Sequence, residues 1–358
     1  MNFSNWPRCV VCAILVFTTV VPFGRGAFAK EAESHFALVQ RTLDKHVVPH
    51  FDELRRTAAQ LPIAVDALCQ GGGDGAREEL STAFRNAVFA WAGAAYLRFG
   101  PLTVGSRRER LAFWPDPRGI MNRQLRQILA AGDASVIDNI SKQSAAVQGL
   151  PALEALIVDK DVPLGPGEPA AYRCKLAAAV AGNIASLTAE IDNDWVKPGG
   201  WKDKMLRPGS DNELYKEPRD AASELVKALL TGLQLVAVTE VDPQVKKRRG
   251  FQGPYSDSNL SKGYFQAGIT SIDQLYQVMA LEAFLDEDKD WAKNWAGGAW
   301  RTLRESDGQG GVVAGVPKTF APSVRKVFDM LMGLRKIFVG ELSAAAAVAV
   351  GFNELDGD

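Results

Sequence analysis

Glu154 has the clearest potential for chemistry, because it is a single carboxylate within the otherwise apolar run of residues 150–157. Pro151 suits the start of a helix, and Gly149 allows the chain to turn sharply into it. Apolar neighbours on almost every side leave little of Glu154 facing water. An ionised carboxylate in such a place needs an arginine or lysine, a metal ion or a raised pKa. A position in the first helical turn would also favour its negative charge.

Two interpretations of Glu154 stay open on these grounds. The carboxylate could serve a ligand or metal site between domains, or it could be a buried structural acid paired with an arginine. Arg98 and Arg118 are the candidate partners, and either cation would lower the pKa of Glu154.

Four short motifs occur in an order that points to a family. They are Gly149-x-Pro151-x-x-Glu154, RFGP at residues 98–101, FWPDPRG at residues 113–119, and GFNELDGD at residues 351–358. Together they resemble the imelysin-like family of secreted bacterial proteins, also called insulin-cleaving membrane proteases. The resemblance implies two helical domains with a cleft between them, and a context of iron regulation and metal or haem acquisition. Pro151 stands where the family motif has histidine, which weakens a peptidase function by analogy.

The segment around Trp114, Asp116 and Arg118 cannot continue a helix, since each of its prolines disfavours helical geometry in the preceding residue. A rigid turn of this kind can line a pocket, or it can close one bundle over another. At the C-terminal end, Asn353 and Asp356 belong to an acidic segment with oxygen ligands suited to hard cations, although its spacing matches no complete calcium loop. The family resemblance suggests that this segment folds back on the body of the protein.

Other catalytic arrangements find little support in the sequence. His46 and His50 have a spacing that can chelate a metal from one helix face, but Pro49 lies between them and we expect ordinary, partly exposed histidines. The chain has no His-Glu-x-x-His motif and no Gly-x-Ser-x-Gly motif. We therefore expect neither a zinc hydrolase of familiar spacing nor a serine nucleophile.

Residues 1–29 read as a secretory signal, with Arg8 before an apolar run and Ala27-Phe28-Ala29 as a cleavage site. The mature protein is then periplasmic or secreted, with no stable membrane span once the signal is removed. Basic and acidic residues are nearly balanced, at 41 and 42 in the whole chain, so the charge gives no footprint for nucleic acid.

Cys69 and Cys174 are the cysteines that remain after signal removal. In an oxidising compartment they are expected to form one disulfide, the alternative being two buried thiols. Neither has a neighbouring cysteine or histidine at metal or redox spacing.

The pattern from Lys30 onward is helical, because apolar residues recur at steps of three and four in segment after segment. Examples are Leu80, Phe84, Ala87, Trp91 and Ala95, and the longer stripe of Val324, Val327, Leu331, Leu334 and Phe338. We predict an all-α protein with two helical-bundle domains, at residues 30–195 and 221–358. Residues 196–220 are rich in proline, glycine and charge, and are predicted to link them.

The sequence and the resemblance together favour a periplasmic binding protein of iron, metal or haem acquisition, with its ligand site near the interdomain cleft. A metallopeptidase of the imelysin type and a non-catalytic scaffold are the alternatives. Iron or another divalent metal is the candidate cofactor, with Glu154 as its ligand. The expected partner is a small ligand, a metal or a periplasmic protein. The candidate ligand-binding residues are Glu154, Arg98, Trp114, Asp116, Arg118, Asn353 and Asp356.

Overall fold

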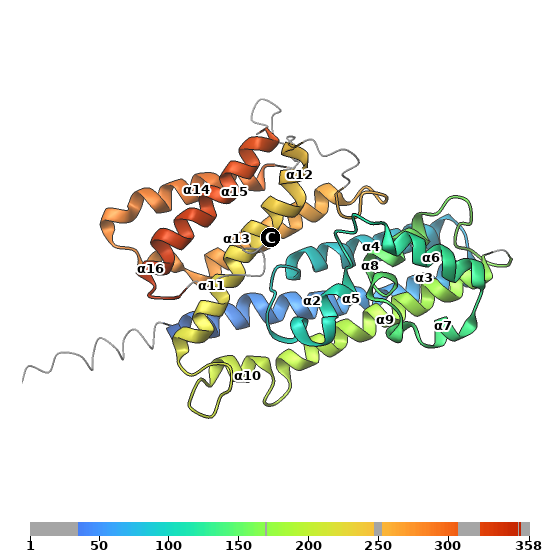
Figure 1. Cartoon of the computed structure of the whole chain (residues 1–358), viewed down its shortest axis with the longest axis horizontal. Coiled ribbons are helices and arrows are strands. Elements are labelled where there is room, and N and C mark those ends of the chain that lie inside the picture. The colour runs from blue at the N-terminus through green and yellow to red at the C-terminus, as the bar shows by residue number, and fades with distance from the viewer. Residues whose placement is uncertain (1–34, 169, 247–252, 307–322, 350, 352–358) are drawn as a thin grey trace, which may run out of the picture.

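The computed structural model describes residues 35–168, 170–246, 253–306, 323–349 and 351 (Figure 1). Within these ranges the chain forms helices joined by turns, and no strand occurs. The all-α class predicted from the apolar stripes is therefore confirmed. The predicted signal at residues 1–29, and the candidate site residues Asn353 and Asp356, lie outside the described residues.

The N-terminal half begins with helical residues 35–42, and its long helix is divided where the prolines predict it. Pro49 and Pro62 each lie in the first turn of a new helix, where the missing N–H breaks no hydrogen bond. The elements of this half are η1 (Leu43–Val47), α2 (Val48–Ala58), α3 (Gln60–Gly71), α4 (Asp74–Ala94), η2 (Gly100–Ser106), α5 (Arg107–Leu111), α6 (Ile120–Ala131), α7 (Ala134–Asp138), η3 (Ile140–Lys142), η4 (Ala145–Val147), α8 (Leu150–Val158) and α9 (Ala171–Val196).

The predicted connection at residues 196–220 contains a short helix, α10 (Trp201–Leu206), which packs on α9 and α11. The helices after it form the C-terminal half. They are α11 (Pro218–Leu235), η5 (Val236–Val241), α12 (Asp242–Val245), α13 (Ser261–Met279), η6 (Leu281–Phe284), η7 (Glu287–Lys289), α14 (Asp290–Arg304), α15 (Val324–Ile337), η9 (Phe338–Leu342) and α16 (Ser343–Ala345).

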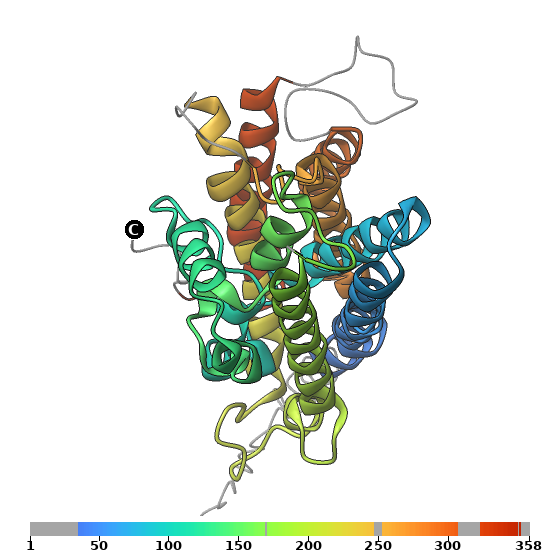
Figure 2. The same ribbon diagram turned by 90° about the vertical axis from the view of Figure 1, so that its right-hand side faces the viewer.

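The two halves meet along a broad helix contact. α13 packs on α4, α2 and α3 each pack on both α4 and α9, and α15 packs on α11 and α14 (Figures 1 and 2). The buried apolar side chains of both halves belong to one continuous cluster. The division into two domains with a cleft therefore stays a prediction.

A disulfide joins Cys69, near the end of α3, to Cys174, near the start of α9. Their Cα atoms are 5.9 Å apart, and 105 positions separate the two residues along the chain. The disulfide predicted from the two cysteines outside the predicted signal is thus confirmed. A cross-link of this kind typically contributes about 2–4 kcal/mol by restricting the unfolded chain.

One described helical stretch, Pro218–Val245, is long and apolar enough to cross a membrane by length and composition. In the structure 72% of its most apolar window is buried inside the protein. A helix at the centre of a core needs the same composition, because it is covered on most of its sides.

Candidate functional site

A pocket of about 520 Å³ lies where the two halves face each other beside α8. The N-terminal half contributes the turn after α5, the start of α6 and α8, and the C-terminal half contributes η5, α12 and the loop before α13. The lining residues are Phe113, Trp114, Pro115, Asp116, Pro117, Gly119, Met121, Asn122, Pro151, Glu154, Val238, Thr239, Pro243, Gly253, Tyr255, Ser256 and Asp257. We refer to it as the Glu154 pocket.

The start of α8 is fixed by a close backbone approach at Gly149. A Cβ atom at this position would lie 2.2 Å from the carbonyl oxygen of Leu111 and 2.4 Å from that of Arg110. Only glycine fits there, and Pro151 follows as the second residue of the helix. The helix begins where the sequence predicts it, and Glu154 projects from its second turn instead of its first.

Glu154 is only 7% exposed and accepts two hydrogen bonds from one residue. The backbone N–H of Ser258 donates to Oε1 at 3.0 Å, and the Ser258 hydroxyl donates to the same oxygen. Oε2 accepts no hydrogen bond from any residue that the structure describes. Burial raises the pKa of Glu154 and the nearby Asp257 charge adds to this, while the two Ser258 bonds oppose the rise.

The arginine partner suspected from the sequence is not present. Within the described ranges Glu154 forms no ion pair. Arg98 lies on a turn that lines a different cavity, and Arg118 is exposed and outside the pocket lining. Among the described residues the groups that bond the carboxylate are a hydroxyl and an amide, so no paired cation offsets the burial that raises the pKa of Glu154.

The turn after α5 brings Trp114 and Asp116 to the Glu154 pocket, as one of the two interpretations of this segment requires. The Asp116 carboxylate is already engaged, since Oδ1 and Oδ2 accept from the N–H groups of Ile120 and Met121 at 2.9 Å each. Asp116 thereby satisfies the free N–H groups at the start of α6 and fixes the pocket wall. Its predicted role as a ligand contact remains a prediction.

The loop of residues 253–260 contributes residues that the sequence analysis missed. Tyr255 is 5% exposed, and its hydroxyl has no hydrogen-bond partner in the part of the chain that the structure covers. Its φ of 55° lies in the left-handed region that non-glycine residues seldom adopt. Ser258 reaches Glu154 across 104 positions of sequence. A lone tyrosine between turn-forming residues in the segment GPYSDS is the only sequence signal for this loop.

The donor set of the pocket does not fit a bare metal ion. Among the described residues no three His, Cys, Asp or Glu side chains gather closely enough to hold one. Glu154 and Asp257 are the carboxylates available beside the helix-bound Asp116. A metal bound here would need most of its ligands from elsewhere.

A second polar group lies inside the core, between α2, α4 and α13. The Tyr96 hydroxyl lies 2.6 Å from His46 Nε2, and 3.2 Å from both the carbonyl oxygen and the hydroxyl of Ser271. The Ser271 hydroxyl in turn lies 2.9 Å from His50 Nε2. His50 Nδ1 donates to the carbonyl of His46 at 2.7 Å. We call these four residues the histidine cluster. The expectation of partly exposed histidines is wrong for His46, which is 1% exposed.

Burial lowers the pKa of His46 to about 2, with a smaller contribution from the neighbouring His50. Burial also lowers the pKa of His50, against the opposing effects of the His46 carbonyl and Glu53. Both rings are therefore neutral at physiological pH. The hydrogen bonds that use their nitrogens leave the cluster suited to joining helices instead of binding metal.

Comparison with known proteins gives a family and a fold. The Imelysin family model matches residues 47–302, which is more than half of the chain. An imelysin-like protein from Psychrobacter arcticum 273-4 has a similar crystal structure, with a TM-score of 0.68 and 17% identity, over 90% of this chain and 98% of that chain. No curated protein matches.

A second crystal structure is that of a provisionally named iron-regulated protein A precursor from Parabacteroides distasonis ATCC 8503. Its TM-score is 0.64 at 13% identity, and the match covers 88% of this chain and 95% of that chain. At such identities the structural likeness establishes the shared helical fold alone.

Proposed function

The chain belongs to the imelysin family, and from that premise we propose that it is a binding protein of iron, metal or haem acquisition, periplasmic or secreted, with its ligand in the Glu154 pocket. The observation that carries this proposal is the state of the Glu154 carboxylate. It is buried, its pKa is raised, and Oε2 accepts no hydrogen bond within the described structure while the side chain lines a pocket. Such a group gains most from a ligand that brings a donor or a positive charge.

The size and lining of the pocket favour a ligand with its own apolar body. About 520 Å³ falls within the range of small-molecule and cofactor sites. Phe113, Trp114 and Tyr255 contribute aromatic side chains to its wall. Because the donor set does not fit a bare ion, we propose that a metal enters already chelated, with haem as the leading candidate.

The cellular context is part of the same proposal. The apolar leader at residues 1–29 and the Cys69–Cys174 disulfide both suit an oxidising compartment outside the cytoplasm. The similar Parabacteroides protein is described as an iron-regulated precursor. These features support export and a link to iron, and they leave the ligand itself to experiment.

A metallopeptidase of the imelysin type is the second candidate, because the matching family model carries a peptidase name. Glu154 could act as a general base, since its raised pKa moves it towards neutral pH. Pro151 lines the pocket where the family motif has histidine, so this chain lacks that side chain as a ligand or catalytic group. The third candidate is a scaffold in which Glu154 only anchors the Ser258 loop.

Thermal unfolding of the mature protein with ferrous iron, ferric iron, zinc, calcium and haem tests the proposal. A ligand at one hundred times its dissociation constant adds about 2.7 kcal/mol to the native state. We expect haem to give the largest rise in Tm, and Glu154→Gln to remove that rise while leaving the fold intact by circular dichroism. Metal analysis of the purified protein accompanies the titration.

Glu240→Gln is the matched control, because Glu240 is also 7% exposed, its pKa is also raised by burial, and it does not line the Glu154 pocket. This variant should keep the ligand-dependent rise. Equal rises in wild type and Glu154→Gln, or no rise with any probe, would contradict the proposal. Chelator-sensitive cleavage of an unfolded substrate that disappears in Glu154→Gln would favour the peptidase instead.

A further inference from the structure

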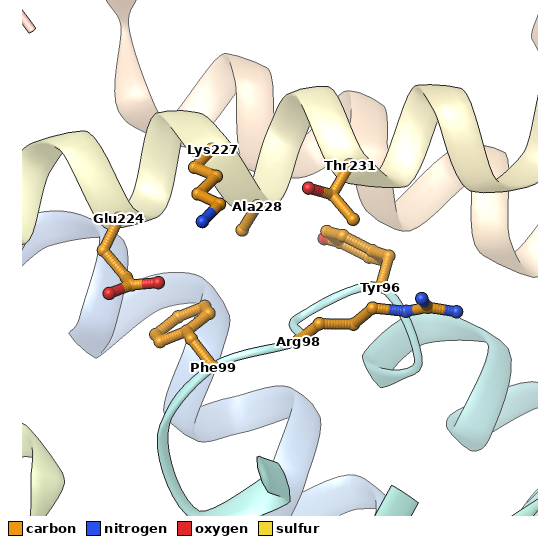
Figure 3. A pocket seen from close by; sticks show the side chains of 7 residues that line it. All are labelled: Tyr96, Arg98, Phe99, Glu224, Lys227, Ala228 and Thr231. Carbon is orange, nitrogen blue, oxygen red and sulfur yellow. The ribbon is translucent and has the colours of Figure 1, made fainter. Parts of the chain in front are cut away.

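A second cavity lies between α11 and the turn that follows α4, at a place that the Glu154 pocket does not include. Its volume is about 150 Å³, and its lining residues are Tyr96, Arg98, Phe99, Glu224, Lys227, Ala228 and Thr231 (Figure 3). The ring of Tyr96 closes one side of it by packing on Gly232 of α11, where a Cβ atom would lie 2.9 Å from Tyr96 Cδ2. The cavity is thus bounded by one element from each half of the chain.

Three polar side chains face this cavity from a single stripe of α11, at positions 224, 227 and 231. Residues three and four apart share one helix face, so Glu224, Lys227 and Thr231 project in the same direction. The stripe is unusual, because α11 is otherwise apolar enough to have the composition of a membrane span. Polar groups on such a helix carry a desolvation cost unless they find partners.

None of these three side chains makes a side-chain hydrogen bond or an ion pair within the described part of the chain. Glu224 and Lys227 have opposite charges at a spacing that allows an ion pair, yet they form neither an ion pair nor a hydrogen bond with any described residue. Figure 3 shows the Lys227 amine directed into the space above the turn and the Glu224 carboxylate reaching down beside Phe99. Thr231 is 4% exposed, and its hydroxyl points into the cavity towards Ala228.

Arg98 lines this cavity with the aliphatic part of its side chain. Its stem runs beneath Tyr96, and its guanidinium is directed away from Glu224 (Figure 3). The charges that meet at the centre are therefore one carboxylate and one ammonium. Burial raises the pKa of Glu224, and the positive charge of Lys227 opposes that rise.

We propose that this cavity binds a small zwitterion of the size of glycine, alanine or serine. The ligand carboxylate lies against Lys227 and the Thr231 hydroxyl, and the ligand ammonium lies against Glu224 and the face of Phe99. The volume sets the size, because a cavity of about 150 Å³ holds a molecule as large as benzene. The class of ligand follows from the two opposite charges, Glu224 and Lys227, which form no ion pair with each other. Only a ligand with both a positive and a negative group can pair with both of them. This site is independent of the ligand proposed for the Glu154 pocket.

Calorimetric titration of the mature protein with glycine, L-alanine and L-serine tests the inference, with acetate and methylammonium as analogues that carry one charge each. We expect saturable binding of at least one amino acid, and binding at least about tenfold weaker for both analogues, because each leaves one charge of the cavity unmatched. Lys227→Met and Glu224→Gln should each weaken amino-acid binding by at least about tenfold.

Two further variants protect the test against misfolding and against the other site. Ala228→Met fills the cavity without removing a charge, and it should abolish binding while the circular dichroism spectrum stays native. Lys326→Met, at an exposed lysine of α15, and Glu154→Gln should both bind as the wild type does. No saturable binding of any amino acid, acetate binding as tightly as glycine, or undiminished binding in Lys227→Met and Glu224→Gln would each overturn the inference.

Discussion

The histidine cluster and the Glu154 pocket are two polar regions in one apolar protein, and they differ in how fully their hydrogen bonds are used. No side chain of the histidine cluster carries a buried nitrogen or oxygen without a partner, whereas Glu154 Oε2 beside the pocket accepts no hydrogen bond from any described residue. The cluster also has no spare room, since a Cβ atom on Gly93 would lie 3.0 Å from His50 Cδ2. The pocket has about 520 Å³.

This difference separates polar groups that stabilise the fold from polar groups available to a ligand. A buried network in which every member has a partner fixes one arrangement of its helices, here α2, α4 and α13. A buried carboxylate with an unused oxygen beside a cavity keeps a desolvation cost that a ligand can relieve. The contrast leads to three tests, which are given in order of decreasing effect.

The first test uses pH, to which the two regions respond with opposite sign. Burial lowers the pKa of His46 from its ordinary value of 6.5 to about 2 in the folded protein, so the unfolded chain takes up a proton at a higher pH than the folded protein does. The stability contributed by neutral His46 is complete above pH 6.5 and is lost as the pH falls below it. Between pH 7.5 and pH 5.0 this loss amounts to about 2 kcal/mol.

Chemical denaturation of wild type and His46→Gln at both pH values isolates that contribution. As the pH falls, the free energy of unfolding of the wild type should decrease by about 2 kcal/mol relative to that of the variant. The raised pKa of Glu154 predicts the reverse, because its stability contribution is complete below the unfolded value and is lost as the pH rises. The free energy of unfolding of the wild type should therefore rise relative to that of Glu154→Gln as the pH falls. If the wild type changed in the same direction relative to both His46→Gln and Glu154→Gln, the distinction between the two regions would be wrong.

The second test makes the same substitution at two buried tyrosines. Tyr96→Phe removes the hydroxyl that lies 2.6 Å from His46 Nε2 and leaves that nitrogen buried without its partner. We expect a loss of about 1.5 kcal/mol in the free energy of unfolding. Tyr255→Phe removes a hydroxyl that has no partner in the described structure, so its effect should lie within about 0.5 kcal/mol of zero or be stabilising.

Urea denaturation of both variants measures the difference, and Tyr172→Phe serves as an exposed control because Tyr172 donates to the Asp133 carbonyl at the surface. A loss in Tyr255→Phe as large as that in Tyr96→Phe would show that Tyr255 has a structural partner. The polar side chains around the pocket would then have their hydrogen bonds used as fully as those of the histidine cluster.

The sequence predicts the local features of this protein better than its contacts across the chain. The apolar stripes predict the helices, and the run around Glu154 predicts its burial, because both depend on neighbours within one or two turns. The cysteine pair is predictable because only two cysteines lie outside the predicted signal at residues 1–29. Each of these inferences needs no knowledge of how distant segments meet.

The partners of Glu154 could not be predicted in this way. Ser258 lies 104 positions away on a loop without regular structure, and nothing in its neighbourhood distinguishes it from other turn serines. Arg98 was suspected because a buried acid is often paired with arginine, but its turn faces α11 instead of α8. Helix packing decides such pairings, and a single sequence does not encode them visibly.

The third test compares two serines with equivalent roles. Ser258→Ala removes the hydroxyl that donates to Glu154 Oε1, and Ser271→Ala removes the hydroxyl between His50 and Tyr96. Water can enter the open pocket and replace the Ser258 hydroxyl, but it cannot enter the closed cluster. Ser271→Ala should therefore lower the free energy of unfolding by about 1 kcal/mol more than Ser258→Ala does in urea denaturation.

The pKa of Glu154 gives a second readout of the same pair. Because the lost Ser258 bond favours ionised Glu154, this pKa should rise further in Ser258→Ala. Equal costs for the two serines would mean that the pocket excludes water as the cluster does, and Glu154 would then be a structural group instead of a binding one.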